Sequence, residues 1–194
     1  MRLFLAIDFP DELKVRIARN VEILKGYIPK GIKWVDKKNL HVTFKFLGDV
    51  NERVLEDLNA PIEGITGKYS PFTISFKDVE MIPNPERPRL IWYDMKDDTE
   101  SASKLFRGVD LALYDLGFSK EKRPLALHTT LGRVKFARNI EWEKISSNLI
   151  PIDDIVKCGE LTLFKSRLTP SGPIYSILKT FPLKKIDKDG GNIQ

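Results

Sequence analysis

Short runs in which every second residue is apolar recur along this chain and predict β-strands. Residues i and i+2 of a strand point to the same side, so such a run buries one face and exposes the other. On this basis strands are predicted over residues 2–8, 32–35, 40–47, 72–81, 90–95, 125–132, 155–166 and 174–181. Pro182 is a natural end for the last strand, because proline cannot donate a hydrogen bond to a sheet.

Apolar residues at helical spacing predict helices between the strands. Within residues 11–27, one face carries a stripe formed by Leu13, Ile17, Val21 and Leu24. Further helices are predicted over residues 51–58, 99–116 and 140–148; Asn51 caps the first of these and Gly117 ends the second. The chain therefore alternates strands and helices along most of its length.

The chain has only two histidines, and each is followed two positions later by threonine. The two motifs are His41-Val42-Thr43-Phe44 and His128-Thr129-Thr130-Leu131. In a strand, each histidine shares a face with its threonine, about 7 Å away. Lys45 continues the first row, and the opposite face is predicted to carry Val42, Phe44 and Phe46.

This doublet matters because histidine can both accept and donate a proton near neutral pH. Two histidines can therefore divide the two proton transfers of a displacement at phosphorus, one as the base and the other as the acid. A neutral threonine hydroxyl can donate a hydrogen bond to a phosphoryl oxygen. The pattern favours chemistry on a phosphate ester.

The two motifs lie 128 − 41 = 87 residues apart, close to half of the chain. Each motif has a predicted helix before it and a helix with a polar start after it. This order indicates an internal duplication, in which two similar lobes face each other across a cleft. The alternative is that two unrelated strands share a short pattern.

Composition limits the remaining classes of protein. With 194 residues, 42% of them hydrophobic and 30% charged, the chain can form one sizeable soluble domain or two closely packed lobes. No apolar run is long enough to cross a bilayer or to act as a signal sequence. The single cysteine, Cys158, excludes an internal disulfide framework and favours a reducing cytoplasm. One glutamine beside abundant Lys, Glu and Ile is typical of thermophiles.

Charge and potential ligands add three expectations. A net charge of +5 is compatible with RNA as a partner, although it is also ordinary for a soluble protein. No metal or other cofactor is expected, because two histidines and one distant cysteine are a poor ligand set for zinc. Residues 1–186 are expected to form a single bilobal domain, followed by a loose polar tail over residues 187–194.

The two motifs and their flanks resemble the 2H phosphoesterase superfamily. Within it they are most similar to the bacterial and archaeal RNA 2′,3′-cyclic phosphodiesterases, also called 2′-5′ RNA ligases. The resemblance rests on Arg2-Leu3-Phe4-Leu5-Ala6-Ile7, Asn39-Leu40-His41-Val42-Thr43-Phe44-Lys45-Phe46-Leu47-Gly48-Asp49, His128-Thr129-Thr130-Leu131-Gly132-Arg133-Val134, Ser166-x-Leu168 and Gly172-Pro173-x-Tyr175. It spans residues 1 to about 182, and Phe44, where many relatives carry Leu, is a mild apolar change.

The resemblance implies an α+β fold with two pseudo-symmetric lobes of antiparallel sheet, and with outer helices, around a central cleft. It implies an RNA substrate ending in a 2′,3′-cyclic phosphate, including the halves of a cut tRNA, which is hydrolysed to a 2′-phosphate. By the family pattern, His41 is the proton donor and His128 the proton acceptor, while Thr43 and Thr130 hold the non-bridging oxygens. The reverse reaction would join RNA ends through a 2′-5′ linkage. We expect a cytoplasmic monomer that does not bind membranes.

Three further residues are candidates for substrate binding: Lys45, Arg133 and Tyr175. Strict alternation points Arg133 away from His128, so it reaches the cleft only if the strand bends, for which Gly132 is a suitable position. Aromatic side chains can stack on a base, which makes Trp34 and Phe9 weaker candidates beside Tyr175. Ser166 is a candidate for a supporting role near the site.

Two alternatives stay open at this stage. The same fold could act on another cyclic phosphodiester, such as ADP-ribose cyclic phosphate. The chain could also be a non-catalytic RNA-binding module, in which the basic surface matters and the histidines do not.

Overall fold

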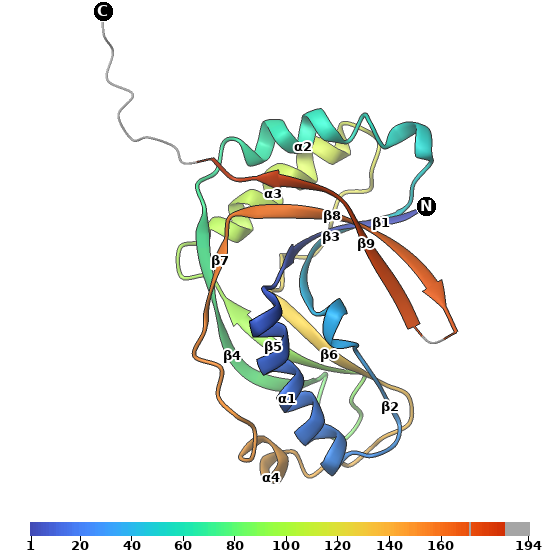
Figure 1. The fold of residues 1–194 in the computed structure, drawn as a ribbon, viewed down its shortest axis with the longest axis vertical. Helices are drawn as coiled ribbons and strands as arrows, with labels where there is room; N and C mark the ends of the chain where they lie inside the picture. Colours follow the sequence, from blue (N-terminus) through green and yellow to red (C-terminus); the bar gives the residue numbers. More distant parts are fainter. Residues whose placement is uncertain (171, 185–194) are drawn as a thin grey trace, which may run out of the picture.

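The computed structural model describes residues 1–170 and 172–184, which form two antiparallel sheets (Figure 1). The upper sheet has the strand order β3-β1-β8-β9, and the lower sheet has the order β2-β6-β5-β4-β7. The upper strands are β1 (Arg2–Asp8), β3 (His41–Asp49), β8 (Glu160–Thr169) and β9 (Gly172–Pro182). The lower strands are β2 (Ile32–Trp34), β4 (Phe72–Ile82), β5 (Leu90–Lys96), β6 (His128–Val134) and β7 (Ile155–Cys158).

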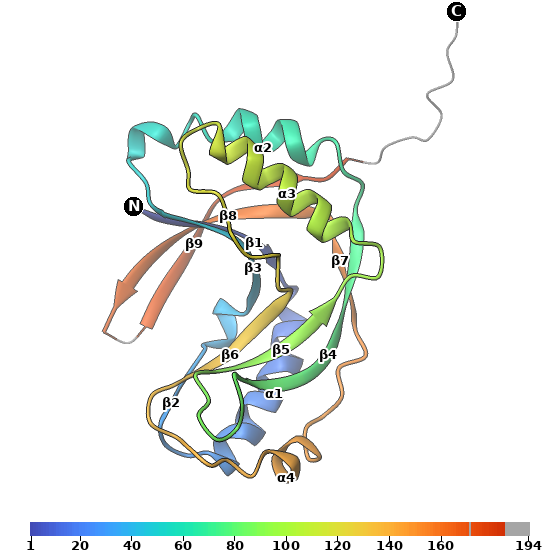
Figure 2. The ribbon, with the colours of Figure 1, turned by 180° about the vertical axis from the view of Figure 1, so that it is seen from behind.

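Helices cover one side of each sheet. Helix α1 (Asp11–Tyr27) lies along the lower sheet and buries the apolar stripe that the sequence predicts (Figure 1). Helices α2 (Asn59–Thr66) and α3 (Ser101–Tyr114) lie together on the outer side of the upper sheet, as Figure 2 shows. The short helix α4 (Trp142–Ser146) lies at the lower end of the molecule. No helix among the described residues is long and apolar enough to cross a membrane.

The two lobes repeat one order of elements. Strand β1 is followed by α1 and, after the short strand β2 and a 3-10 turn (Lys37–Asn39), by β3, which pairs antiparallel with β1. Strand β5 is followed by α3 and then by β6, which pairs antiparallel with β5. Each histidine is the first residue of the last strand in its repeat. The predicted α+β architecture of two similar antiparallel lobes is therefore confirmed.

The two repeats exchange their helices. The helix between β1 and β3 covers the sheet that contains β5 and β6, and its buried Asn20 hydrogen-bonds to Tyr93 of β5. The helix between β5 and β6 packs against β3 in the other sheet. The two lobes are therefore interlocked, because each sheet is covered by a helix from the other repeat.

Several predicted elements were wrong in extent or type. The helix predicted over residues 51–58 is only a short 3-10 turn, η2 (Glu52–Val54), while α2 begins at Asn59. The strand predicted over residues 155–166 is two strands that lie in different sheets, β7 and β8, with Gly159 between them. The alternation of buried residues changes phase here, from Val156 and Cys158 to Leu161 and Leu163, and the prediction of one continuous strand overlooked this signal.

Two predictions remain, the polar tail at the end of the chain and the extents of two helices. The tail predicted over residues 187–194 lies beyond the described residues. Among the predicted helices, 99–116 and 140–148 are present in shorter form as α3 and α4.

Both histidine-bearing strands contain a β-bulge at the same place. Between β1 and β3, Ala6 pairs with Thr43 and Leu5 pairs with Lys45, so Phe44 is the extra residue. Between β5 and β6, the pairing skips Leu131 in the same way. Each extra residue follows its histidine by three positions. A bulge shifts the side-chain alternation by one residue, so the residues beyond it change face.

Candidate active site

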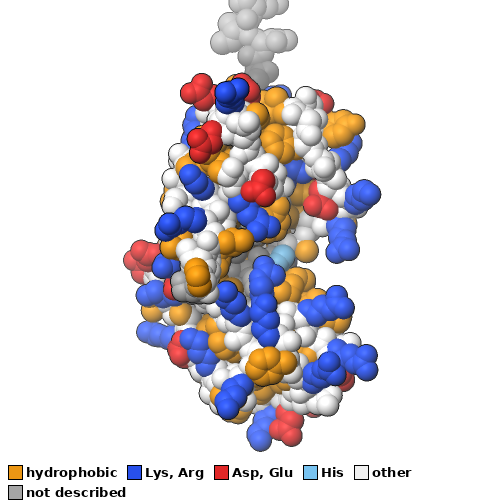
Figure 3. Space-filling view, turned by 90° about the vertical axis from the view of Figure 1, so that its right-hand side faces the viewer, with side chains coloured by type: hydrophobic (Ala, Val, Ile, Leu, Met, Phe, Trp, Pro, Cys, Tyr) orange, Lys and Arg blue, Asp and Glu red, His pale blue; other side chains and the backbone are white. Residues whose placement is uncertain are grey.

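The two histidines lie on the facing sides of the two lobes. Strands β3 and β6, which begin with His41 and His128, contact each other between the sheets. The two rings interact electrostatically, because the charge of His128 lowers the pKa of His41. Figure 3 shows a histidine in the hollow between the upper and lower halves of the molecule, with Lys and Arg side chains around it. Thr43 and Thr130 are partly exposed beside their histidines.

Each histidine ring is held by the backbone in the same way. The Nδ1 atom of His41 lies 2.7 Å from the carbonyl oxygen of Asn39, and Nδ1 of His128 lies 2.8 Å from that of Ala126. A carbonyl oxygen can only accept, so Nδ1–H is the donor in both contacts and Nε2 is the nitrogen left for chemistry. Nε2 of neutral His41 accepts a hydrogen bond from the Thr43 hydroxyl at 3.0 Å.

A carboxylate lies opposite each histidine in the neighbouring strand. Asp8 of β1 is the register partner of His41, and Asp94 of β5 is the register partner of His128. Each carboxylate also pairs with a lysine, Asp8 with Lys14 at 2.7 Å and Asp94 with Lys77 at 2.9 Å. The sequence analysis missed both aspartates. Their signal in the sequence is an Asp at or near the end of each strand that pairs with a histidine strand, since Asp8 ends β1 and Asp94 lies two residues before the end of β5.

Burial is the main influence on both imidazoles. Burial lowers the pKa of His41, while the hydrogen bond to Asn39 and the carboxylate of Asp8 raise it in part. Burial likewise lowers the pKa of His128, while its hydrogen bond to the Ala126 carbonyl and the carboxylate of Asp94 raise this pKa in part. Both rings therefore favour the neutral form at neutral pH, which suits proton acceptance, and their neighbours set how readily either becomes charged.

Aromatic rings pack against both histidines. The ring of Tyr175 meets His41 edge-on, at 5.4 Å between centroids and 80° between planes, and Phe4 lies 5.0 Å from the same histidine. Trp92 of β5 packs against His128 at 4.2 Å, and the sequence analysis missed this residue. The candidates Tyr175 and Ser166 are register partners across β8 and β9.

Arg133 reaches the cleft because of the bulge. Strict alternation would point it away from His128, but the extra residue Leu131 shifts the pattern, and Arg133 is exposed. Its charge lowers the pKa of both His128 and Tyr175, so it lies near groups from both lobes. The bend that the sequence analysis required is present, one residue before Gly132.

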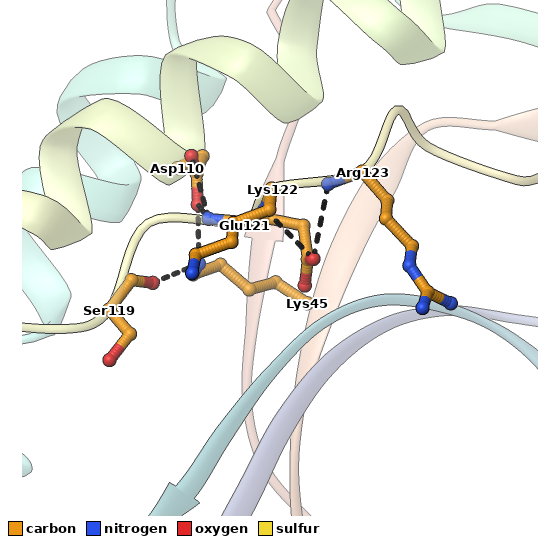
Figure 4. Close-up of polar contacts among 6 residues, drawn as sticks. All are labelled: Lys45, Asp110, Ser119, Glu121, Lys122 and Arg123. Atoms are coloured by element: carbon orange, nitrogen blue, oxygen red, sulfur yellow. Dashed lines mark hydrogen bonds and ion pairs between the residues drawn. The ribbon is translucent and has the colours of Figure 1, made fainter.

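A β-bulge also turns Lys45 away from the site, so the prediction that Lys45 lies in the cleft was wrong. Beyond the bulge at Phe44, Lys45 points into the upper lobe and only 5% of it is exposed. Its Nζ forms an ion pair with Asp110 of α3 and donates to the Ser119 carbonyl at 3.0 Å, as Figure 4 shows. Phe46 was predicted to be buried and is instead 68% exposed, for the same reason.

Two aromatic candidates lie elsewhere. Phe9 is 3% exposed and packs in the main core against Phe76. Trp34 is partly buried against the core, next to Gly132, where an added Cβ would lie 2.9 Å from its ring. Burial therefore leaves no face of Phe9 for a base, whereas Trp34 keeps part of its surface exposed. No three His, Cys, Asp or Glu side chains among residues 1–170 and 172–184 are grouped as metal ligands would be.

Comparison with protein families decides the classification. The family model described as LigT-like phosphoesterase matches residues 7–92 and 94–175, which include both histidine motifs. The chain belongs to this family. The resemblance to the 2H phosphoesterases is therefore confirmed, and this LigT-like chain is a phosphoesterase.

Curated relatives with similar sequences carry a more specific name than the family model does. The chain is 38% identical over 183 residues to the RNA 2′,3′-cyclic phosphodiesterase of Methanocaldococcus jannaschii, covering 92% of this chain and 99% of the relative. It is 33% identical to the protein of the same name from Methanothermobacter thermautotrophicus, covering 94% of this chain and 99% of that one. Several relatives come from thermophiles, as the composition suggests.

Solved structures share the fold. The crystal structure of TT0787 from Thermus thermophilus superposes with a TM-score of 0.75 at 24% identity, covering 94% of this chain and 98% of that chain. The structure of E. coli LigT complexed with 3′-AMP gives a TM-score of 0.73 at 25% identity, covering 95% and 98%. The LigT-like chain therefore has the bilobal architecture of these proteins.

Proposed function

We propose that this LigT-like chain hydrolyses the 2′,3′-cyclic phosphate at an RNA end to a 2′-phosphate. The observation that carries the proposal is the pair of imidazoles on facing lobes, each held through Nδ1 and each with a threonine hydroxyl on its own face. The printed names of the relatives, RNA 2′,3′-cyclic phosphodiesterase, support this choice of substrate.

In the proposed reaction, Nε2 of His128 takes a proton from a water molecule as the water oxygen attacks phosphorus. The bond from phosphorus to the 3′ oxygen breaks, and Nε2–H of His41 gives its proton to that oxygen. Charge develops on the two non-bridging oxygens, which accept hydrogen bonds from the hydroxyls of Thr43 and Thr130. A proton lost by His41 and one gained by His128 are then exchanged with solvent.

The hydrogen bond between His41 and Thr43 couples protonation to substrate binding. When Nε2 of His41 is neutral, the Thr43 hydroxyl donates to it at 3.0 Å. When Nε2 carries a proton, it can no longer accept, so the hydroxyl proton is free to turn toward a phosphoryl oxygen. Arg133 would attract the phosphate, and Tyr175 would offer a ring to the terminal base.

The same atoms allow the reverse reaction. A 5′-hydroxyl of a second RNA end in place of water would be deprotonated by one histidine and would open the cyclic phosphate into a 2′-5′ linkage. Hydrolysis is favoured in water, because water is present in large excess over RNA ends.

The test is incubation with an oligonucleotide that ends in a 2′,3′-cyclic phosphate, followed by comparison of the product with synthetic 2′-phosphate and 3′-phosphate standards. A 2′-phosphate, formed equally fast with and without EDTA, is expected. A 3′-phosphate product or loss of activity with EDTA would contradict the mechanism. Parallel assays on ADP-ribose cyclic phosphate, and of RNA binding without turnover, would reveal the two alternative functions.

A further inference from the structure

A second group of basic residues lies beyond the end of β6 that is remote from His128. It lines a pocket of about 540 Å³ that is formed by the loop before β5 and by the segment after β6. The amide of Val134 donates to the carbonyl of Arg89 at 2.9 Å and joins the two segments. We call this feature the cationic pocket; its charged residues are Arg87, Arg89, Lys135 and Arg138.

The charges of the cationic pocket are not neutralised within the part of the chain that the structure describes. All four side chains are exposed, and none of them forms an ion pair or a side-chain hydrogen bond with residues 1–170 or 172–184. No carboxylate lines the pocket. Other cations of the chain, such as Lys77 and Lys179, do pair with carboxylates. The cationic pocket is therefore available to an anionic ligand.

An aromatic ring lies among these cations. Phe136 lines the cationic pocket and is 72% exposed, which is unusual for a phenylalanine. Its ring is held against the backbone, since a Cβ added at Gly31 would lie 3.0 Å from Cδ2 of the ring. Unpaired cations that attract phosphates, beside an exposed ring that a base can stack on, are the combination by which proteins bind single-stranded nucleic acid.

The position of the cationic pocket relates it to the cleft. Lys135 follows Arg133 by two residues and His128 by seven, so it lies roughly 20 Å from His128 at the rise of a strand. Exposed Lys33 is the register partner of Arg133 and extends the basic surface across β2. The segment after β6 runs along the side of the lower lobe above which the β8–β9 hairpin projects (Figures 1 and 2). In Figure 3, Lys and Arg side chains continue from the histidine hollow over the lower lobe.

We propose that the cationic pocket binds the phosphates and bases of the RNA strand that leads to the cyclic end, several nucleotides before that end. This inference rests on the proposed function, because it assumes that the terminal phosphate lies between His41 and His128. A stacked strand rising about 3.4 Å per nucleotide would cover the separation with about six nucleotides. Short substrates would then occupy the cleft alone, and long ones both places.

The experiment compares two substrates, a 2′,3′-cyclic mononucleotide and an RNA of about twelve nucleotides with the same end. The variant is Arg87→Ala/Arg138→Ala. The matched control is Lys104→Ala/Arg107→Ala, which removes two exposed cations of α3 on the outer side of the upper lobe. Binding of the same RNA with a 3′-hydroxyl end is measured by fluorescence anisotropy over a range of salt concentrations. Phe136→Ala is measured in the same assays.

We expect the pocket variant to raise KM for the long RNA about tenfold at 0.1 M salt and to lower the salt slope of its affinity by about 1.4, since each single-strand phosphate contact contributes about 0.7. Turnover of the cyclic mononucleotide should be unchanged, and the control should match the wild type. Phe136→Ala should weaken binding of the long RNA about fivefold or more.

Two outcomes would overturn the inference: an unchanged KM and affinity for the long RNA, or an equal loss on both substrates. The anisotropy measurement separates this inference from the proposed function. If the wild type turned over neither substrate, the proposed function would fail, while binding of the 3′-hydroxyl RNA by wild type and variant would still decide whether the cationic pocket holds RNA.

Discussion

Phe44 and Leu131 occupy the same place in the two lobes, each as the extra residue of a β-bulge three positions after a histidine. Each bulge changes which residues beyond the motif face the cleft. In the upper lobe it turns Lys45 inward and Phe46 outward, and in the lower lobe it turns Arg133 outward. Beyond the motifs, the bulges therefore expose an aromatic ring in the upper lobe and a cation in the lower lobe, although the two motifs are nearly the same.

The pH dependence follows from the buried imidazoles. The reaction needs one histidine protonated and one neutral, a state most populated midway between the two pKa values. Burial lowers both pKa values below 6.5, so kcat/KM should peak below pH 6.5 and fall as the pH rises through neutrality. The profile of kcat should peak at higher pH, because a bound anionic phosphate favours imidazolium. A kcat/KM maximum above pH 7 would contradict this assignment.

Each of the two carboxylates opposite the histidines should raise the pKa of its own histidine and leave the other unchanged. Asp8→Asn removes a charge that raises the pKa of His41, and it also leaves the positive charge of Lys14 uncompensated. The pKa of His41 should therefore fall further, while that of His128 stays in place. Asp94→Asn should lower the pKa of His128 by less, since Lys77 is exposed to solvent.

These changes in the two histidine pKa values can be measured directly by NMR titration, because a chain with two histidines gives two Cε1–H resonances. Asp154→Asn, which removes a carboxylate paired with Arg16 instead, is the control. Unchanged titration curves in both variants would show that Asp8 and Asp94 do not act on the imidazoles.

Lys45 should matter for stability and not for substrate binding. Lys45→Met leaves Asp110 buried without its partner, which typically costs about 3–5 kcal/mol. The melting temperature should fall by roughly 10 °C, and KM at 25 °C should stay within about twofold. Lys45→Met/Asp110→Leu should recover much of the stability. A raised KM with an unchanged melting temperature would place Lys45 at the substrate after all.

Thr129 is a second position where the lobes differ. Its hydroxyl is fully buried and has no hydrogen-bond partner among the described residues, whereas Val42 occupies the equivalent place after His41. Thr129→Val should therefore stabilise the fold by about 1 kcal/mol in urea unfolding, with unchanged turnover. Val42→Thr should destabilise it by a similar amount or more. Destabilisation by Thr129→Val would mean that the hydroxyl has a favourable role.

The local pattern of apolar and polar residues was sufficient to predict much of the fold and the two histidines at the centre of the site. The motifs placed His41 and His128 on strands, and their spacing predicted two facing lobes. What the pattern could not predict depends on partners in other strands. The register that places Asp94 and Trp92 beside His128 is set by pairing between β5 and β6, and so is the bulge that moves Arg133. The change of sheet at Gly159, by contrast, coincides with a change of phase in the alternation, which the prediction of a single strand over residues 155–166 overlooked.

The most direct test of the account is the single-turnover rate of His41→Ala and His128→Ala on two cyclic-phosphate substrates, one normal and one with sulfur in place of the 3′ oxygen. Both variants should lose about 10²- to 10⁴-fold on the normal substrate, with RNA affinity nearly unchanged. A thiolate leaves without a proton, so the sulfur substrate should restore His41→Ala and leave His128→Ala slow. Rescue of His128→Ala alone would reverse the roles of acid and base, and full activity in either variant on the normal substrate would contradict the two-histidine mechanism.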